Sequence, residues 1–246
     1  MDPKPIDRTG CDRVGAVKYG PRTLRAIVTE RRRQKVFVIG RNKSGTSTIC
    51  DYLAGRGLVV GSEAAGERLL EHWTRRDFDP IVRFCRRAQV FKDIPFSYPF
   101  TFQAMDQAFP GSKFVLSVWP SADDWYSAFT GFHARQFGGG NVPTADQLRM
   151  ADYRDPGFVL ETLQLLYGTS DESPYDRDTL IEQYNRHVDT VQEYFAHRPD
   201  DLIVLDIGAP GGQRALCRFL GLSVDGGEFP IGRPDVGAEE VLRRDQ

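Results

Sequence analysis

A short apolar run that leads into a glycine-rich loop constrains the fold of this chain more than any other feature. Residues 35–40 read KVFVIG, which is typical of a buried strand, and residues 46–57 read TSTICDYLAGRG, which has the spacing of a helix that stops at Gly55 or Gly57. The segment 40–48 that joins them contains two glycines. A strand, a tight loop and a helix in this order predict the first unit of a parallel α/β fold.

The same alternation continues along the chain. The apolar pattern predicts further strands at 58–61, 88–95, 113–119 and 201–207. It predicts helices within 63–87, where Pro80 favours two helices over one, and then after Ser121, over 173–197 and over 212–222. Residues 138–157 are rich in glycine, proline and acidic residues and fit a mobile connection or a plain surface loop equally well. We therefore expect three α/β/α layers around a mostly parallel sheet, with a ligand at the carboxyl ends of the strands.

Composition excludes several classes of protein. The chain has 246 residues, of which 40% are hydrophobic and 27% charged, and its net charge is −2, so neither a disordered chain nor a nucleic-acid-binding protein is indicated. No apolar stretch approaches the roughly 20 residues of a membrane span. The four cysteines are far apart, with no CxxC pair and no histidine at metal-ligand spacing, so we expect no disulfide, no metal and a reducing, cytoplasmic setting.

The charge is distributed unevenly. Residues 1–35 carry ten Lys and Arg against four Asp and Glu. Three Asp within the first twelve residues, and the lack of a following apolar segment, argue against a targeting sequence. We predict a basic N-terminal arm over 1–34 and a single α/β domain over 35–246. Arg31, Arg32 and Arg33 at the end of the arm either are solvated or face an anionic ligand.

The loop at 40–48 has a composition suited to binding an anion. Its glycines have P-loop spacing, and such a loop directs backbone N–H groups at a phosphate beside a helix N-terminus. The nucleoside-triphosphatase signature GK[ST] is missing, because Thr46 follows Gly45 and Lys43 stands two residues earlier. Lys43 would instead lie beside the bridging oxygen between a 5′-phosphate and a transferred group, where it stabilises the leaving oxygen. A sulfuryl group carries less charge than a phosphoryl group, so such a transfer needs no metal. The alternative is a glycine-rich turn without a ligand.

Three segments resemble the PAPS-dependent sulfotransferases, in particular the bacterial branch with a G-x-x-K-S-G-T-[ST] loop. VFVIGRNKSGTST is similar to the 5′-phosphosulfate loop, and FPGSKFVLSVWPSADDWYSAF is similar to the family's second strand and helix. YNRHVDTVQEYFAHRPDDLIVLDI with LCRFLGL resembles the closing helix, strand and helix. The resemblance covers the chain from residue 35 onward and implies a P-loop-like sulfotransferase fold. It also implies metal-independent transfer of a sulfuryl group from PAPS to a hydroxyl or amine of a small-molecule, lipid or carbohydrate acceptor. The product formed from the donor is PAP.

The resemblance also implies the residues that bind the donor. In the family, an arginine that ends the second strand and a serine eight residues later hold the 3′-phosphate; Ser127 matches the serine, whereas Trp119 replaces the arginine. An indole has one N–H and no charge, and losing a bidentate arginine weakens binding by roughly ten- to a hundredfold. Arg41, Arg135 or one of Arg31 to Arg33 could substitute; otherwise Trp119 stacks on an acceptor or adenine ring, or PAPS binds poorly. The implied donor-binding residues are Arg41, Asn42, Lys43, Ser44, Gly45, Thr46, Ser47, Thr48, Trp119 and Ser127.

The acceptor must lose a proton, and two residues are candidates for accepting it. Asp93 lies at the end of the third strand, where related enzymes place a base or an acceptor-positioning group; it could equally be a turn carboxylate. His133 resembles a histidine of the bacterial relatives; the alternative is a surface or hydrogen-bonded structural histidine. If the strand stays regular, Lys92 points away from Asp93.

Two aromatic clusters could line an acceptor pocket or belong to the core: Phe96, Tyr98, Phe100 and Phe102, and Trp119, Trp125, Tyr126, Phe129 and Phe132.

Two other functions fit the same sequence less well. A P-loop kinase or nucleotide hydrolase would need magnesium and a Walker-type lysine, neither of which the sequence indicates. A binding or regulatory protein could keep the sulfotransferase fold after losing its 3′-phosphate contact, and Trp119 is the residue that supports this alternative.

Overall fold

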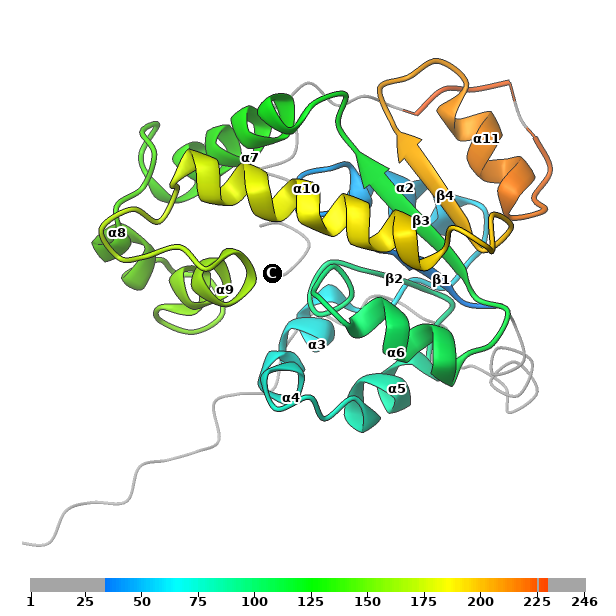
Figure 1. The fold of residues 1–246 in the computed structure, drawn as a ribbon, viewed down its shortest axis with the longest axis horizontal. Coiled ribbons are helices and arrows are strands. Elements are labelled where there is room, and N and C mark those ends of the chain that lie inside the picture. The colour runs from blue at the N-terminus through cyan, green and yellow to red at the C-terminus, as the bar shows by residue number, and fades with distance from the viewer. Residues whose placement is uncertain (1–33, 225, 230–246) are drawn as a thin grey trace, which may run out of the picture.

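A computed structural model describes residues 34–224 and 226–229, and these residues contain one parallel sheet. The strands are β1 (Val36–Val38), β2 (Val90–Lys92), β3 (Lys113–Val118) and β4 (Leu202–Asp206). They are hydrogen-bonded in the order β2-β1-β3-β4 (Figure 1). In the register of the sheet, Val36 lies opposite Val90 and Lys113. The α/β class predicted from the alternation of strands and helices is confirmed.

Helices connect the strands and flank the sheet (Figure 1). Ser121 caps α7 as predicted, because its Oγ accepts a hydrogen bond from the Asp124 N–H at 3.1 Å. The helices are α2 (Thr46–Gly55), α3 (Glu63–Glu67), α4 (Leu70–Thr74), α5 (Asp79–Cys85), α6 (Thr101–Ala108), α7 (Ala122–Phe137), α8 (Ala145–Arg149), α9 (Phe158–Tyr167), α10 (Arg177–Tyr194) and α11 (Gly212–Phe219).

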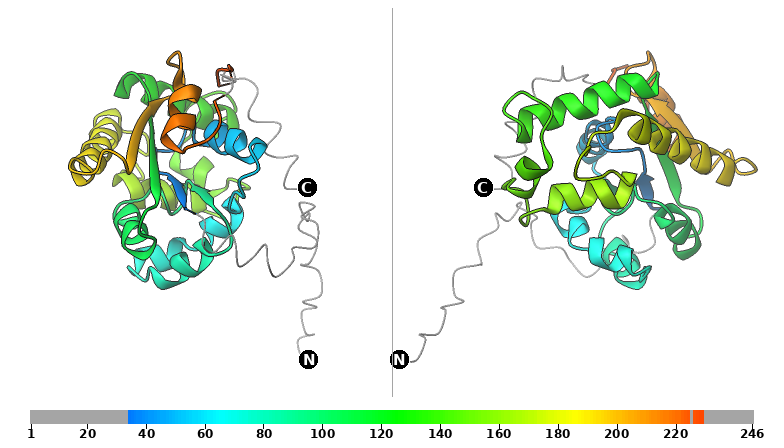
Figure 2. Two further views of the ribbon diagram at one scale, coloured as in Figure 1. Left: turned by 90° about the vertical axis from the view of Figure 1, so that its right-hand side faces the viewer. Right: turned by 60° about the vertical axis from the view of Figure 1, so that its left-hand side comes forward.

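Two apolar cores lie on opposite faces of the sheet. Successive side chains of a strand point to opposite faces, so Val36 and Val38 pack with α2 and α11, whereas Phe37 packs with the opposite set of helices. This second core includes residues of α5, α6, α7, α9 and α10. The left view of Figure 2 shows α10 on one side of the sheet and α2 with α11 on the other. The chain thus has the three α/β/α layers that the sequence predicts.

The predicted strand at 58–61 is wrong. Val60 forms only an isolated parallel bridge to Val90, although the Gly61 N–H donates to the Val90 carbonyl at 2.8 Å. A Cβ on Gly61 would lie 2.7 Å from the Phe91 ring, so the chain can pass this close to β2 only with glycine there. Residues 58–61 therefore pair with the edge strand β2 at one position only.

Helix boundaries also differ from the prediction. Residues 63–87 form three helices, α3, α4 and α5, and α10 is shorter than the predicted helix at 173–197 because Asp176 caps it through the Thr179 N–H at 2.9 Å. The stretch 138–157, interpreted as a loop, includes the short helix α8 with a capping box between Thr144 and Gln147. The helices α6 and α9 were not predicted.

Several predictions fall outside the described residues. These include the basic arm except Gln34, the arginines Arg31 to Arg33, and Cys11.

Cys50, Cys85 and Cys217 are buried and form no disulfide. Within 34–224 and 226–229, no group of three or more His, Cys, Asp or Glu side chains could hold a metal ion. No helix in this part of the chain has the length and apolarity needed to cross a membrane.

The order of the strands reverses at β1. The chain moves from β1 to β2 on one side and then crosses to β3 on the other side of β1. In an open α/β sheet, ligands bind at the carboxyl ends of the strands where the order reverses in this way. The segments that leave these two ends are the 40–45 loop after β1 and residues 119–121 after β3.

Candidate active site

The 40–45 loop is held closely against the end of β3. A Cβ on Gly40 would lie 2.1 Å from the Ser117 Oγ, so only glycine allows this approach. The Ser44 Oγ lies 2.8 Å from the Ser117 Oγ and donates to the Arg41 carbonyl at 2.6 Å. The Ser44 N–H, predicted to bind the donor, also bonds this carbonyl, at 3.1 Å. The loop is thus closed by its own hydrogen bonds before any ligand binds.

The first turn of α2 presents unpaired backbone N–H groups beside this loop. Gly45 precedes the helix with a φ of 88°, and no side chain caps the helix there. The first backbone hydrogen bond into α2 runs from the Ile49 N–H to the Gly45 carbonyl at 3.1 Å. An α-helix leaves its first four N–H groups without intrahelical acceptors, so the amides of residues 45–48 have no backbone partner among the described residues. Without an acidic residue in this turn, the helix end favours an anion.

Lys43 lies within the loop with its ammonium over an aromatic ring. Its Nζ is 3.3 Å from the centroid of the Phe132 ring on α7, and its φ is 68°. Burial lowers the pKa of Lys43 to about 8, against the opposing attraction of Asp93. Among the described residues, Lys43 forms no ion pair. Its charge is therefore not neutralised by a bound carboxylate.

Two indole N–H groups bind the carbonyls of this loop. The Trp119 Nε1 donates to the Lys43 carbonyl at 2.7 Å, and the Trp125 Nε1 donates to the Asn42 carbonyl at 2.9 Å. The Trp119 backbone N–H donates to the Tyr184 hydroxyl at 3.0 Å. Trp119 therefore supports the loop through its one indole donor, which leaves no N–H on this side chain for a phosphate.

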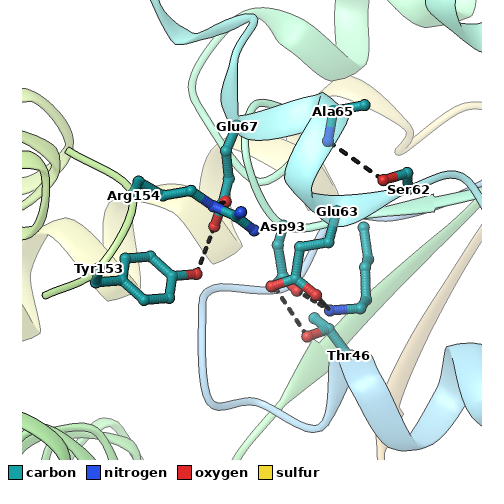
Figure 3. A network of polar contacts seen from close by, with 9 residues as sticks. Thr46, Ser62, Glu63, Ala65, Glu67, Asp93, Tyr153 and Arg154 are labelled. Carbon is teal, nitrogen blue, oxygen red and sulfur yellow. Dashed lines mark hydrogen bonds and ion pairs between the residues drawn. The ribbon is translucent and has the colours of Figure 1, made fainter. Parts of the chain in front are cut away.

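Asp93 lies on the other flank of the loop in a network of charges (Figure 3). Its Oδ1 accepts from the Thr46 hydroxyl at 3.0 Å, and its other oxygen forms an ion pair with Lys92, which also pairs with Glu63 of α3. Burial acts to raise the pKa of Asp93, but the ammonium groups of Lys92 and Lys43 outweigh it and lower this pKa. The expectation that Lys92 points away is wrong, because β2 ends at Lys92 and Asp93 has a φ of 54°.

A second buried carboxylate holds α3 in place. Glu67 accepts a hydrogen bond from the Tyr153 hydroxyl at 2.6 Å and forms an ion pair with Arg154 (Figure 3). Burial raises the pKa of Glu67 in spite of both contacts. Since Glu63 and Glu67 lie one turn apart on α3, this anchor also fixes the carboxylate that pairs with Lys92.

His133 is buried behind Lys43. Its Nδ1 lies 2.7 Å from the Tyr175 hydroxyl, and its ring lies 4.4 Å from the Phe129 ring. Burial and the charge of Lys43 lower the pKa of His133 to about 3, so the ring is neutral at pH 7. Tyr175 also lines a cavity of about 310 Å³ together with Tyr126. A neutral, hydrogen-bonded ring at this position is a weak proton acceptor.

The predicted contacts to a 3′-phosphate are not assembled in one place. Ser127 is exposed on α7. Arg41 is 2% exposed and turned into the protein, where its Nη1 donates to the Ser97 carbonyl at 2.8 Å and its guanidinium lies 5.5 Å from the Tyr167 ring. Arg41 is thus a buried support of the loop and does not reach the surface that carries Ser127.

Sequence reasoning missed the functional contacts of two aromatic residues. Trp125 and Phe132 were assigned only to a general cluster, although both contact the loop. Their separation of seven residues, about two helical turns, was the available signal that they share one face of α7.

The predicted aromatic cluster at residues 96–102 belongs mainly to the core. Phe96, Tyr98 and Phe102 are each at most 2% exposed.

Comparison with known proteins agrees with this architecture. The family model described as "Sulfotransferase domain" matches residues 35–233, which is most of the chain and includes the sheet, the 40–45 loop and α7. No curated protein matches the chain significantly. Because the family match spans the whole described α/β unit, the chain belongs to the sulfotransferase domain family.

Proposed function

We propose that this protein transfers a sulfuryl group from PAPS to a hydroxyl or amine of an acceptor. Family membership supports sulfotransferase activity in general and implies an acceptor substrate. The observation that carries the donor assignment is Lys43, which has no ion pair among the described residues and belongs to the loop that leads into the unpaired amides of α2. These groups suit an anion of the size of a 5′-phosphosulfate.

In this proposal the chain binds and orients the donor. The amides of residues 45–48 hold the 5′-phosphate and sulfonate oxygens, and Lys43 stabilises charge on the bridging oxygen. The bond from sulfur to that oxygen breaks while a bond from sulfur to the acceptor forms, and PAP leaves with the bonding electron pair. Ser127 remains the proposed contact to the 3′-phosphate, with no metal required.

The acceptor proton goes to Asp93 in this proposal. Both side chains are buried, but the Asp93 carboxylate contacts the first residue of α2 through the Thr46 hydroxyl, whereas the His133 Nδ1 is bonded to Tyr175. The ammonium groups of Lys92 and Lys43 lower the pKa of Asp93, so in this proposal it accepts the proton only after the acceptor atom has begun to bond to sulfur and has become more acidic. His133 stays the alternative acceptor of the proton.

A thermal shift experiment tests the donor assignment. The purified protein is heated with adenosine 3′,5′-bisphosphate without metal, and separately with ATP and magnesium. At about 100 times its dissociation constant, the bisphosphate should add roughly 2.7 kcal/mol of stability. Stabilisation only by ATP with magnesium would contradict the proposal in favour of a kinase, and no stabilisation by either would contradict donor binding.

A binding or regulatory protein is the second candidate, and the position of Trp119 favours it. Its indole N–H is committed to the Lys43 carbonyl, and Arg41 is buried, so neither replaces the family's arginine. Trp119→Arg distinguishes the two candidates. Unchanged affinity for the bisphosphate and unchanged turnover would support the enzyme, whereas an affinity gain of tenfold or more would support a degenerate 3′-phosphate site.

A further inference from the structure

One face of α7 and the residue that follows β3 contact the 40–45 loop. Trp119 and Trp125 donate to successive loop carbonyls, and Phe132 lies under the ammonium of Lys43. Because a peptide group is planar, these two hydrogen bonds fix the orientation of the peptide groups that follow Asn42 and Lys43. The loop is therefore oriented by three aromatic side chains.

The charges around Lys43 come from three elements. Asp93 and Lys92 at the end of β2, with Glu63 and Glu67 on α3, act on Lys43 through space, and His133 on α7 is neutral beside it. None of these carboxylates forms an ion pair with Lys43 within the described residues. The ring of Phe132 is the contact that holds the ammonium.

A ring and a carboxylate hold a lysine in different ways. A cation–π contact attracts the ammonium and leaves its positive charge in place. A carboxylate in a buried ion pair binds a lysine firmly and neutralises its charge. Lys43 therefore keeps an unpaired positive charge among the described residues, whereas the charge of Lys92 is paired with Asp93 and Glu63.

We propose that Phe132 is a positioning residue of the sulfuryl-transfer site, whose ring holds the Lys43 ammonium without neutralising it, on a loop that Trp119 and Trp125 orient. The meaning of this contact for turnover rests on the proposed function. The contact itself can be tested without any donor, so the two can fail separately.

The titration of the Lys43 amine can be measured by trace acetylation at a series of pH values. Mass spectrometry detects the peptide that contains Lys43. Phe132→Leu keeps the site apolar but removes the ring, so the ammonium loses its attraction while burial remains. The expected midpoint for Lys43 falls by about one pH unit. Phe132→Tyr restores a ring and should return the midpoint to the wild-type value.

Phe137→Leu is the matched control, since it makes the same change on α7 against the His133 ring, 5.4 Å away, and not against Lys43. Equal midpoints in wild type and Phe132→Leu, or equal shifts in both leucine variants, would overturn the proposal. If Phe132→Leu does not fold, Phe132→Met makes the same test with a more adaptable side chain.

Thermal shift with the bisphosphate separates this inference from the proposed function. If the Lys43 midpoint shifts in Phe132→Leu but the bisphosphate does not stabilise the protein, the result supports the positioning role of Phe132 and contradicts the donor assignment. If the bisphosphate stabilises the protein but the midpoint does not shift, the result contradicts the positioning role of Phe132 and leaves the donor assignment supported. When both hold, the alkaline limb of the turnover profile should move in Phe132→Leu by the same amount as the acetylation midpoint.

Discussion

The two flanks of the 40–45 loop hold their lysines by opposite chemistry. On one flank Lys43 rests on the ring of Phe132, and on the other Lys92 is enclosed by Asp93 and Glu63. Among the described residues, the aromatic flank leaves the charge of Lys43 without an ion pair, whereas the carboxylate flank pairs Lys92 and contacts Thr46 through Asp93. The comparison teaches that a lysine at this edge of the sheet is available to a ligand only where no carboxylate pairs with it.

Breaking the carboxylate flank should have the largest effect, and on stability. Lys92→Met leaves the carboxylate of Asp93 buried without its ammonium, since both side chains are only about a tenth exposed. We expect a loss of about 3–5 kcal/mol in the free energy of unfolding. Urea denaturation measures it, with Arg75→Met of the exposed Arg75–Glu71 pair as the control. A loss below about 1 kcal/mol would contradict the structural role of Lys92.

Removing Lys43 should affect turnover and not stability. Lys43→Ala takes away a buried charge that has no ion pair among the described residues, so the free energy of unfolding should not fall in the way that it does for Lys92→Met. Turnover should fall by about 10²–10³-fold because one stabilising donor of the transition state is lost. A sulfotransfer assay and urea denaturation of the same preparation check both parts. Unaltered turnover would remove Lys43 from the mechanism.

The aromatic flank should also make stability depend on pH through His133. Its pKa of about 3 in the folded protein lies below the ordinary value of 6.5, so the unfolded chain binds the proton more readily. Stability should therefore fall as the pH drops below about 6.5, by up to about 1.4 kcal/mol for each pH unit until the folded pKa is reached.

His133→Gln keeps a partner for Tyr175 and should remove this contribution. The comparison is unfolding at pH 7 and pH 5, where the variant should lose less stability than the wild type. Buried His187, whose pKa is also lowered, titrates in both proteins and keeps some pH dependence in the variant. Equal losses in the two proteins would show that His133 titrates normally.

The smallest predicted effect concerns the loop carbonyl. Trp119→Phe keeps a ring but removes the indole donor of the 2.7 Å bond to the Lys43 carbonyl. Trp119 is 36% exposed, so water can replace part of this bond, and we expect a loss of about 0.5–1.5 kcal/mol in stability. Thermal unfolding measures it. A larger loss in bisphosphate affinity than in stability would show that the loop orientation, and not the fold, depends on Trp119.

Much of the fold follows from local sequence patterns. Apolar runs at 35–40, 113–119 and 201–207 become β1, β3 and β4, and Ser121 caps the helix that follows β3. These features depend on residues close together in the chain. The segment at 58–61 has a similar apolar pattern but forms one bridge, because its pairing depends on how closely β2 can be approached.

The sequence alone determined the order of strand, loop and helix around Gly40, Lys43 and Gly45, since this order depends on residues that are close together in the chain. Only the tertiary structure decided what surrounds Lys43. Trp119 reaches its carbonyl across 76 residues of sequence, and the turn at Asp93 brings Lys92 to the same edge of the sheet. Contacts between segments this far apart depend on strand order and backbone dihedrals, which no spacing of residues encodes by itself.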